Sequence, residues 1–141
     1  MKITHDLLNE VIEHALEDPK NEVCGVVAVV ELNGTGVDQP ARAIDVHRAL
    51  NVHASPLKFE IDPSELLELY NSIEAAGLTL GAIYHSHVRS KPYPSQTDIG
   101  FAANWPAVEW VIVGLADGQA PEVRSYLIED GQVREVALEV E

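Results

Sequence analysis

Two histidines separated by a single residue, His85 and His87, are the most informative feature of the sequence. Side chains at positions i and i+2 of an extended chain point to the same side, about 6.6 Å apart along the strand. Two imidazoles placed in this way can converge on one metal ion, and zinc binds histidine nitrogen at about 2.0–2.1 Å. The pair alone is a weak signal, because histidines in a partly exposed loop would have the same spacing.

A serine and an acid follow the histidines, in Ser95-Gln96-Thr97-Asp98. A carboxylate from a second element would complete a three-ligand site and leave the fourth position of a tetrahedral zinc open for water, as a catalytic site requires. The same four residues are also typical of a helix start, in which Ser95 and Asp98 cap the helix without any chemistry. The two interpretations are compatible, because such a cap would fix Asp98 in the direction of the histidines.

A third group of candidate residues lies upstream, in Asn21-Glu22-Val23-Cys24-Gly25. Glu22 is an unusual residue at the mouth of an apolar strand, although a solvated strand end is the common explanation for such an acid. Cys24 is expected to be a small buried side chain rather than a nucleophile, because no nearby residue would activate its thiol. Gly25 is expected to allow a close approach to its backbone.

The rest of the sequence predicts the elements that must position these residues. Apolar spacing and capping signals predict helices over Thr4–Glu17, from Asp62 to Gly77 with Glu65 in the capping position, and over Ser95 to about Ala103. The predicted strands are 23–32 with a turn at Asn33-Gly34, one or two strands within 41–52, and 79–84, 110–115, 122–127 and 133–138. The segment from Val88 to Pro94 is expected to be a loop. This order predicts one mixed α/β domain over residues 1–141, with a curved, mostly antiparallel sheet flanked by helices.

Composition limits the cellular setting of the protein. A chain of 141 residues with 46% hydrophobic residues can bury its own core, and its single cysteine, Cys24, fits a reducing cytosol. The N-terminal segment lacks the apolar run of a signal peptide, and no stretch approaches the roughly 18 apolar residues that span a bilayer. We therefore expect a soluble, cytoplasmic protein.

The chain is strongly acidic, with 9 basic and 23 acidic residues and a net charge of −14. Nucleic acids and anionic membranes require a basic surface, so neither is an expected partner. The charge is compatible with a solubilising surface, with adaptation to a salty cytoplasm, or with steering toward a basic partner. Composition does not separate these three explanations.

Taken together, Glu22-x-Cys24-Gly25, His85-x-His87 and Ser95-x-x-Asp98 resemble the motif of the JAMM metalloproteases, also called MPN-plus domains. The resemblance covers essentially the whole chain and implies a cytidine-deaminase-like α/β fold. Among JAMM proteins the chain is most similar to the short bacterial members, which act on ubiquitin-like sulfur-carrier proteins. An example of this activity is the release of cysteine from the C-terminal glycine of a carrier.

The resemblance also implies a role for each residue of the motif. His85, His87 and Asp98 would bind Zn²⁺. Glu22 would hold the attacking water as general base and then act as acid toward the leaving amine. Ser95 would donate a hydrogen bond to the developing oxyanion. The implied enzyme is a zinc metallopeptidase that cleaves the peptide or isopeptide bond after the terminal glycine of its substrate.

The substrate implied by the resemblance is a carrier with a Gly-Gly tail, because the large insertions with which some relatives grip ubiquitin chains have no room in 141 residues. Ser86 is expected to have only a structural role, and the loop Val88–Pro94 either contacts substrate or is solvated. The alternative function is a non-catalytic module of the same fold that recognises a ubiquitin-like tail. A zinc deaminase is excluded, because it needs a Cys-x-x-Cys pair. The oligomeric state is not predicted.

Overall fold

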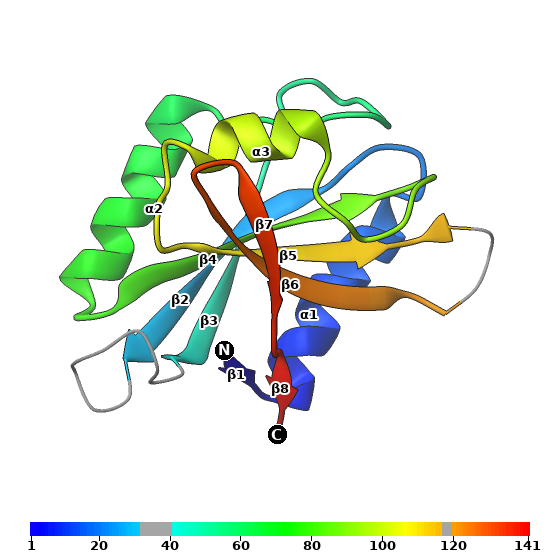
Figure 1. Ribbon diagram of the computed structural model, residues 1–141. Coiled ribbons are helices and arrows are strands. Elements are labelled where there is room, and N and C mark those ends of the chain that lie inside the picture. The colour runs from blue at the N-terminus through cyan, green and yellow to red at the C-terminus, as the bar shows by residue number, and fades with distance from the viewer. Residues whose placement is uncertain (32–40, 117–119) are drawn as a thin grey trace.

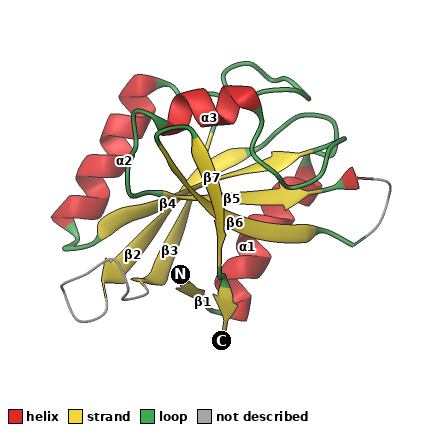
Figure 2. Cartoon of the chain, viewed as in Figure 1, coloured by secondary structure: helices red, strands yellow, loops and turns green. Residues whose placement is uncertain are grey.

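The computed structural model describes residues 1–31, 41–116 and 120–141, in which eight strands form one sheet and three helices pack against it (Figures 1 and 2). In chain order the elements are β1 (Lys2–Ile3), α1 (His5–Glu17), β2 (Cys24–Glu31), β3 (Ala41–Ala49), α2 (Pro63–Ala75), β4 (Thr79–His87), α3 (Gln96–Ala102), β5 (Glu109–Gly114), β6 (Glu122–Glu129), β7 (Gln132–Val136) and β8 (Glu139–Val140). The predicted mixed α/β class is confirmed.

The sheet has the order β7-β6-β5-β4-β2-β3-β1-β8. Its central pairs β2–β3 and β2–β4, and the outer pairs β5–β6 and β6–β7, are antiparallel. The pairs β4–β5, β1–β3 and β1–β8 are parallel. Register shifts around Val27, Ala28 and Val29 interrupt both ladders of β2, and such irregularities increase the bend and twist of a strand. The curved, mostly antiparallel sheet is therefore confirmed.

The helices divide between the two faces of the sheet, with α1 on one side and α2 and α3 on the other (Figure 1). Helix α1 begins at Thr4, whose hydroxyl accepts a hydrogen bond from the Leu7 N–H, and it buries Val11 and Ala15 in the core that contains Tyr84. Helices α2 and α3 close a second core around Trp110, Ile83 and Ile73. In residues 1–31, 41–116 and 120–141, no helix is long and apolar enough to span a bilayer.

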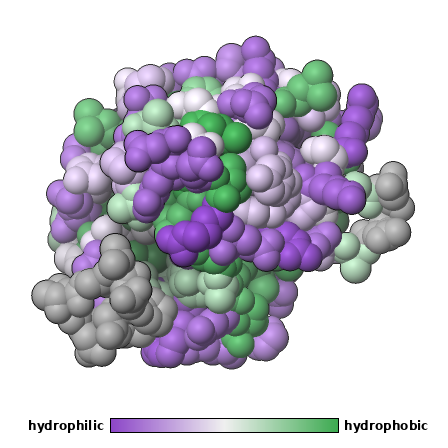
Figure 3. All heavy atoms as spheres, in the orientation of Figure 1, coloured by the Kyte–Doolittle hydropathy of each residue, from purple (hydrophilic) through white to green (hydrophobic). Residues whose placement is uncertain are grey.

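Most of the face seen in Figure 3 is hydrophilic, in keeping with the net charge of −14. Several large apolar side chains are nevertheless exposed. Two of the most exposed lie in the connection between β3 and α2: Leu50 (69% exposed) and Leu57 (74%). This connection passes close to the candidate site described below.

Three details of the fold differ from the sequence predictions. Strand β4 continues through His87, so that both histidines lie on a strand rather than beyond its end. The two-residue strands β1 and β8 were not predicted, because so short a segment carries no periodic signal. Glu65 does not complete a capping box on α2, since its carboxylate accepts a hydrogen bond from the Leu50 N–H at 2.9 Å. The turn predicted at Asn33-Gly34 lies outside the described residues.

Candidate functional site

Strand register brings the first three candidate residues together. In the antiparallel pair β2–β4, Cys24 lies opposite His85. Glu22 precedes Cys24 by two residues and His87 follows His85 by two, so all four side chains belong to one face of the sheet. Residues far apart in the sequence thus meet at one end of two neighbouring strands, and Glu22, His85 and His87 can be grouped with one ligand atom from each within 4.8 Å of the others.

Ser86 points to the opposite side from the histidines and links the same two strands. Its hydroxyl accepts a hydrogen bond from the Val23 N–H at 2.9 Å, and its own N–H donates to the Val23 carbonyl at 3.1 Å. Ser86 is completely buried. These contacts support the structural role expected of Ser86, because they hold the start of β2 against the end of β4.

Helix α3 supplies the remaining two candidates through a capping box at its N-terminus. The Ser95 hydroxyl accepts a hydrogen bond from the Asp98 N–H at 3.1 Å, and the Asp98 carboxylate accepts one from the Ser95 N–H at 2.9 Å. Asp98 is 3% exposed and Ser95 is half-buried. The cap thereby aims the Asp98 carboxylate at the histidines, while Ser95 remains at the surface of the site.

Three potential ligand atoms form a nearly equilateral triangle. His85 Nε2 lies 3.1 Å from His87 Nε2 and 3.1 Å from Asp98 Oδ2, and His87 Nε2 lies 3.2 Å from the same oxygen. Ligand atoms of a tetrahedral zinc, each about 2.0–2.1 Å from the ion, lie roughly 3.3–3.4 Å from one another. The observed spacing therefore fits three ligands of one small metal ion with a fourth position open.

The hydrogen bonds around the triangle favour a cation at its centre. His87 Nδ1 donates to the Lys91 carbonyl at 2.9 Å, so a neutral His87 directs the lone pair of Nε2 toward Asp98. His85 stacks on Phe59, with ring centroids 4.4 Å apart and an angle of 23° between the planes. Within the described part of the chain, His85 Nδ1 has no hydrogen-bond partner. The contact with Phe59 fixes the plane of the buried His85 ring, and it was not predicted from the sequence.

The pKa shifts of His85, His87 and Asp98 also favour a positive charge among these three side chains. Burial lowers the pKa of His85. Burial would raise the pKa of Asp98, but hydrogen bonds with His85 and His87 outweigh it and hold the pKa well below its usual range. For His87, burial acts to lower the pKa, and its contacts with Asp98 and the Lys91 carbonyl outweigh burial and raise it. A proton shared in the metal-free group would be released when a metal binds.

Glu22 lies beside the triangle and is almost completely buried. It is 5% exposed, and its Oε1 has no hydrogen-bond partner among the residues that the structure describes. Burial raises the pKa of Glu22 to about 7; the His87 ring acts to lower it and the Asp98 carboxylate raises it further. A carboxylate with a pKa near neutral can accept and release a proton at working pH, which suits general acid–base chemistry.

The expectations for Cys24 and Gly25 also have a physical basis in the structure. Cys24 is completely buried, and burial raises the pKa of its thiol to about 12, which excludes a thiolate nucleophile. A Cβ on Gly25 would collide with the ring of Tyr84 and with the His47 carbonyl. Gly25 therefore permits the close backbone approach that its position predicted, and the side chain that needs this space is Tyr84.

The loop 88–94 is buried at its two prolines, Pro92 and Pro94, and exposed at most of its other residues. The Pro92 carbonyl accepts a hydrogen bond from the Tyr126 hydroxyl. Tyr93 is 56% exposed, and Arg89 and Lys91 are exposed as well. These side chains agree with a solvated loop beside the site.

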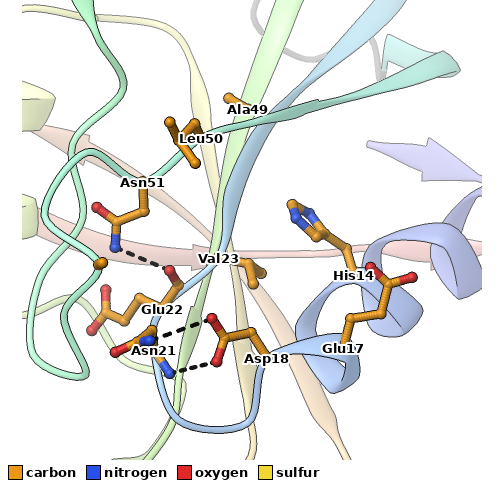
Figure 4. A pocket seen from close by; sticks show the side chains of 10 residues that line it. His14, Glu17, Asp18, Asn21, Glu22, Val23, Ala49, Leu50 and Asn51 are labelled. Carbon is orange, nitrogen blue, oxygen red and sulfur yellow. Dashed lines mark hydrogen bonds between the residues drawn. The ribbon is translucent and has the colours of Figure 1, made fainter.

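A cavity of about 310 Å³ has Glu22 in its lining (Figure 4). It lies between the end of α1, the start of β2 and the end of β3. Its lining is formed by His14, Glu17, Asp18, Asn21, Glu22, Val23, Ala49, Leu50, Asn51 and Ala54. The sequence did not predict this cavity, because its walls come from three separate segments.

Comparison with known proteins agrees with this geometry. The family model described as prokaryotic homologs of the JAB domain matches residues 4–129. The chain belongs to this family. The predicted relationship to JAMM and MPN domains is thereby confirmed, and the site described above is that of a prokaryotic JAB-domain protein.

Members of the family with similar sequences or structures cover most of the chain. A CysO-cysteine peptidase of Mycobacterium tuberculosis (strain ATCC 25618 / H37Rv) is 37% identical over 138 residues, covering 98% of this chain and 89% of the relative. A probable TtuB-protein conjugate cleaving protease of Thermus thermophilus is 38% identical over 139 residues, covering 98% and 81%. The solution structure of a Desulfitobacterium hafniense protein matches with a TM-score of 0.84 at 26% identity, covering 99% of this chain and 92% of that one.

Proposed function

We propose that this prokaryotic JAB-domain protein is a zinc-dependent hydrolase that cleaves the bond after the C-terminal glycine of a ubiquitin-like carrier protein. The observation that carries the proposal is the triangle of His85 Nε2, His87 Nε2 and Asp98 Oδ2. Beside it lies Glu22, whose buried Oε1 has no hydrogen-bond partner among the described residues. A purely structural role would not leave a buried acid without a hydrogen-bond partner next to three converging ligand atoms.

The donor set favours zinc among the common metals. Two imidazole nitrogens and one carboxylate oxygen with tetrahedral spacing match the three protein ligands of many catalytic zinc sites. Magnesium and calcium prefer six or more oxygen ligands, which the residues around the triangle do not provide. Zinc bound here would polarise the scissile carbonyl and lower the pKa of a water molecule toward neutral.

The protein's own side chains would supply the proton transfers. Glu22 Oε1 is free to accept a proton from the attacking water and, with its pKa near 7, can then deliver that proton to the leaving amine. The Ser95 oxygen already accepts the Asp98 N–H, so its own hydroxyl hydrogen is free to be donated to the oxyanion. In this scheme the same serine caps α3 and stabilises the transition state.

The names of the relatives support a carrier-protein substrate. Two of them are called a CysO-cysteine peptidase and a TtuB-protein conjugate cleaving protease. A carbonyl that must lie between Glu22, Ser95 and the metal can enter only on an extended chain, and glycine passes a narrow entrance because it has no side chain. We therefore infer that the substrate is a flexible tail ending in Gly-Gly, joined to cysteine or to a short peptide.

The proposal is tested with a small set of synthetic substrates and mass spectrometry. Zinc-loaded protein should release cysteine from a carrier–cysteine adduct. It should leave unchanged an adduct whose last two glycines are alanine, although the carrier still binds. Linked ubiquitin dimers serve as the competing substrate. Equal rates on the alanine adduct, or a preference for ubiquitin dimers, would reject the substrate assignment and leave only the metal chemistry.

A further inference from the structure

The segment between β3 and α2, residues 50–62, passes beside Glu22 and is organised by one side chain, Asn51. The Nδ2 atom of Asn51 donates to two carbonyl oxygens, those of Glu22 and Lys58, each at 3.0 Å (Figure 4 shows the bond to Glu22). Its Oδ1 accepts from two backbone N–H groups of the segment, those of His53 (3.1 Å) and Glu60 (3.2 Å). Both hydrogens and the oxygen of the amide are therefore engaged.

Both backbone polar groups of Glu22 are held by this segment. Its carbonyl accepts the Asn51 amide, and its N–H donates to the Ser55 carbonyl at 2.8 Å. The next residue, Val23, is fixed to Ser86 on the neighbouring strand. Glu22, the proposed general base, is thus held by β4 on one side and by the segment 50–62 on the other.

The backbone contacts are important because one oxygen of the Glu22 carboxylate makes no hydrogen bond within the described residues. Glu22 Oε1 has no hydrogen-bond partner in the described residues, so the position of the carboxylate follows from the position of its backbone. Displacement of a reacting group by about 1 Å can cost roughly 10²-fold in rate. Loss of the Asn51 contact would therefore affect catalysis without removing any group that touches the metal or the substrate.

We propose that Asn51 is a positioning residue that sets the backbone of Glu22 and ties it to the segment 50–62, an inference that rests on the proposed function of Glu22 as general base. An amide is required at this position. It must donate to two carbonyl oxygens and accept from two N–H groups, and an aspartate of the same shape could only accept. In the Asn51→Asp variant a carboxylate oxygen would face the carbonyls of Glu22 and Lys58, and both contacts would become repulsive.

The test compares Asn51→Asp and Asn51→Ala with a control variant from the same segment. The control is Asp62→Ala, which removes the hydrogen bond from the Ser64 N–H to the cap of α2 (2.7 Å). In the described residues Asp62 makes no hydrogen bond with Glu22. For both Asn51 variants we expect kcat on the carrier–cysteine adduct to fall roughly 10- to 100-fold. We expect KM within about threefold and the zinc content unchanged. The control should lose a few degrees in Tm with kcat within about twofold.

A second readout does not depend on turnover. Hydrogen exchange of the Glu22 amide should accelerate by roughly tenfold or more in the Asn51 variants relative to Asp62→Ala, because the segment that accepts the Glu22 N–H is released. An inactive wild-type protein would reject the proposed function, and the exchange rates would still decide whether Asn51 holds Glu22. Exchange and kcat equal to those of Asp62→Ala, or a loss confined to KM, would overturn the inference.

Discussion

Replacement of Glu22 by glutamine should separate catalysis, metal binding and stability, because the side chain keeps its shape and loses only its charge. Glu22 and Asp98 are both acids beside His85 and His87, but Asp98 is the one whose oxygen lies 3.1 and 3.2 Å from the two imidazole nitrogens. We therefore expect Glu22→Gln to retain about one zinc per chain. Loss of the proposed general base should reduce kcat by roughly 10²–10⁴-fold, or about 3–5 kcal/mol in the barrier.

The same change should stabilise the metal-free protein at neutral and higher pH. Burial raises the pKa of Glu22 from its ordinary 4.5 to about 7, so the folded state resists ionisation of this group. The corresponding free energy is at most about 3 kcal/mol, and relaxation of the surroundings reduces it to roughly 1–3 kcal/mol. The destabilisation is absent below pH 4.5, grows as the pH rises to 7 and is complete above 7. Glutamine, which does not ionise, avoids it.

Thermal unfolding of chelator-treated protein between pH 4.5 and 8 measures this difference. The Tm of Glu22→Gln should exceed that of the wild type by roughly 3–10 °C at pH 8 and by nothing measurable near pH 4.5. A constant difference across this range would show that charge burial is not the cause. Loss of zinc as severe as in His85→Ala would make Glu22 a metal ligand and refute its assignment as the base.

Three further predictions concern neighbouring residues. His87→Ala should lose bound zinc, measured by elemental analysis, while circular dichroism shows the fold retained, because His87 belongs to neither hydrophobic core; full zinc occupancy in a His85→Ala, His87→Ala double variant would contradict the ligand assignment. Ser95→Ala should reduce kcat by roughly 10²–10³-fold and stability by about 1 kcal/mol; lost stability with normal turnover would leave only the helix cap. Gly25→Ala should lower the free energy of unfolding by about 1–3 kcal/mol in denaturant titrations, since its Cβ would overlap the ring of Tyr84; an unchanged midpoint would show that this contact yields without cost.

Local signals in the sequence were sufficient for the positions of the helices and for the shared face of the two histidines. Asp62 and Ser95 cap their helices as predicted, because a cap depends on residues only two or three positions apart. The spacing of His85 and His87 placed both rings on one face for the same reason, since alternation is a property of a single strand. The assignments of zinc and of each catalytic role remain predictions.

Tertiary structure alone decided how the distant parts of the site meet. Glu22 lies beside His87 because of the register between β2 and β4, and register depends on hydrogen bonds between strands that no local pattern encodes. Glu65 illustrates the same limit. Its position predicted a capping contact within α2, but its carboxylate instead accepts a hydrogen bond from the Leu50 N–H in another segment. The stacking of Phe59 on His85 and the hydrogen bond from Asn51 to the Glu22 carbonyl likewise join segments far apart in the chain. Only the folded molecule could reveal them.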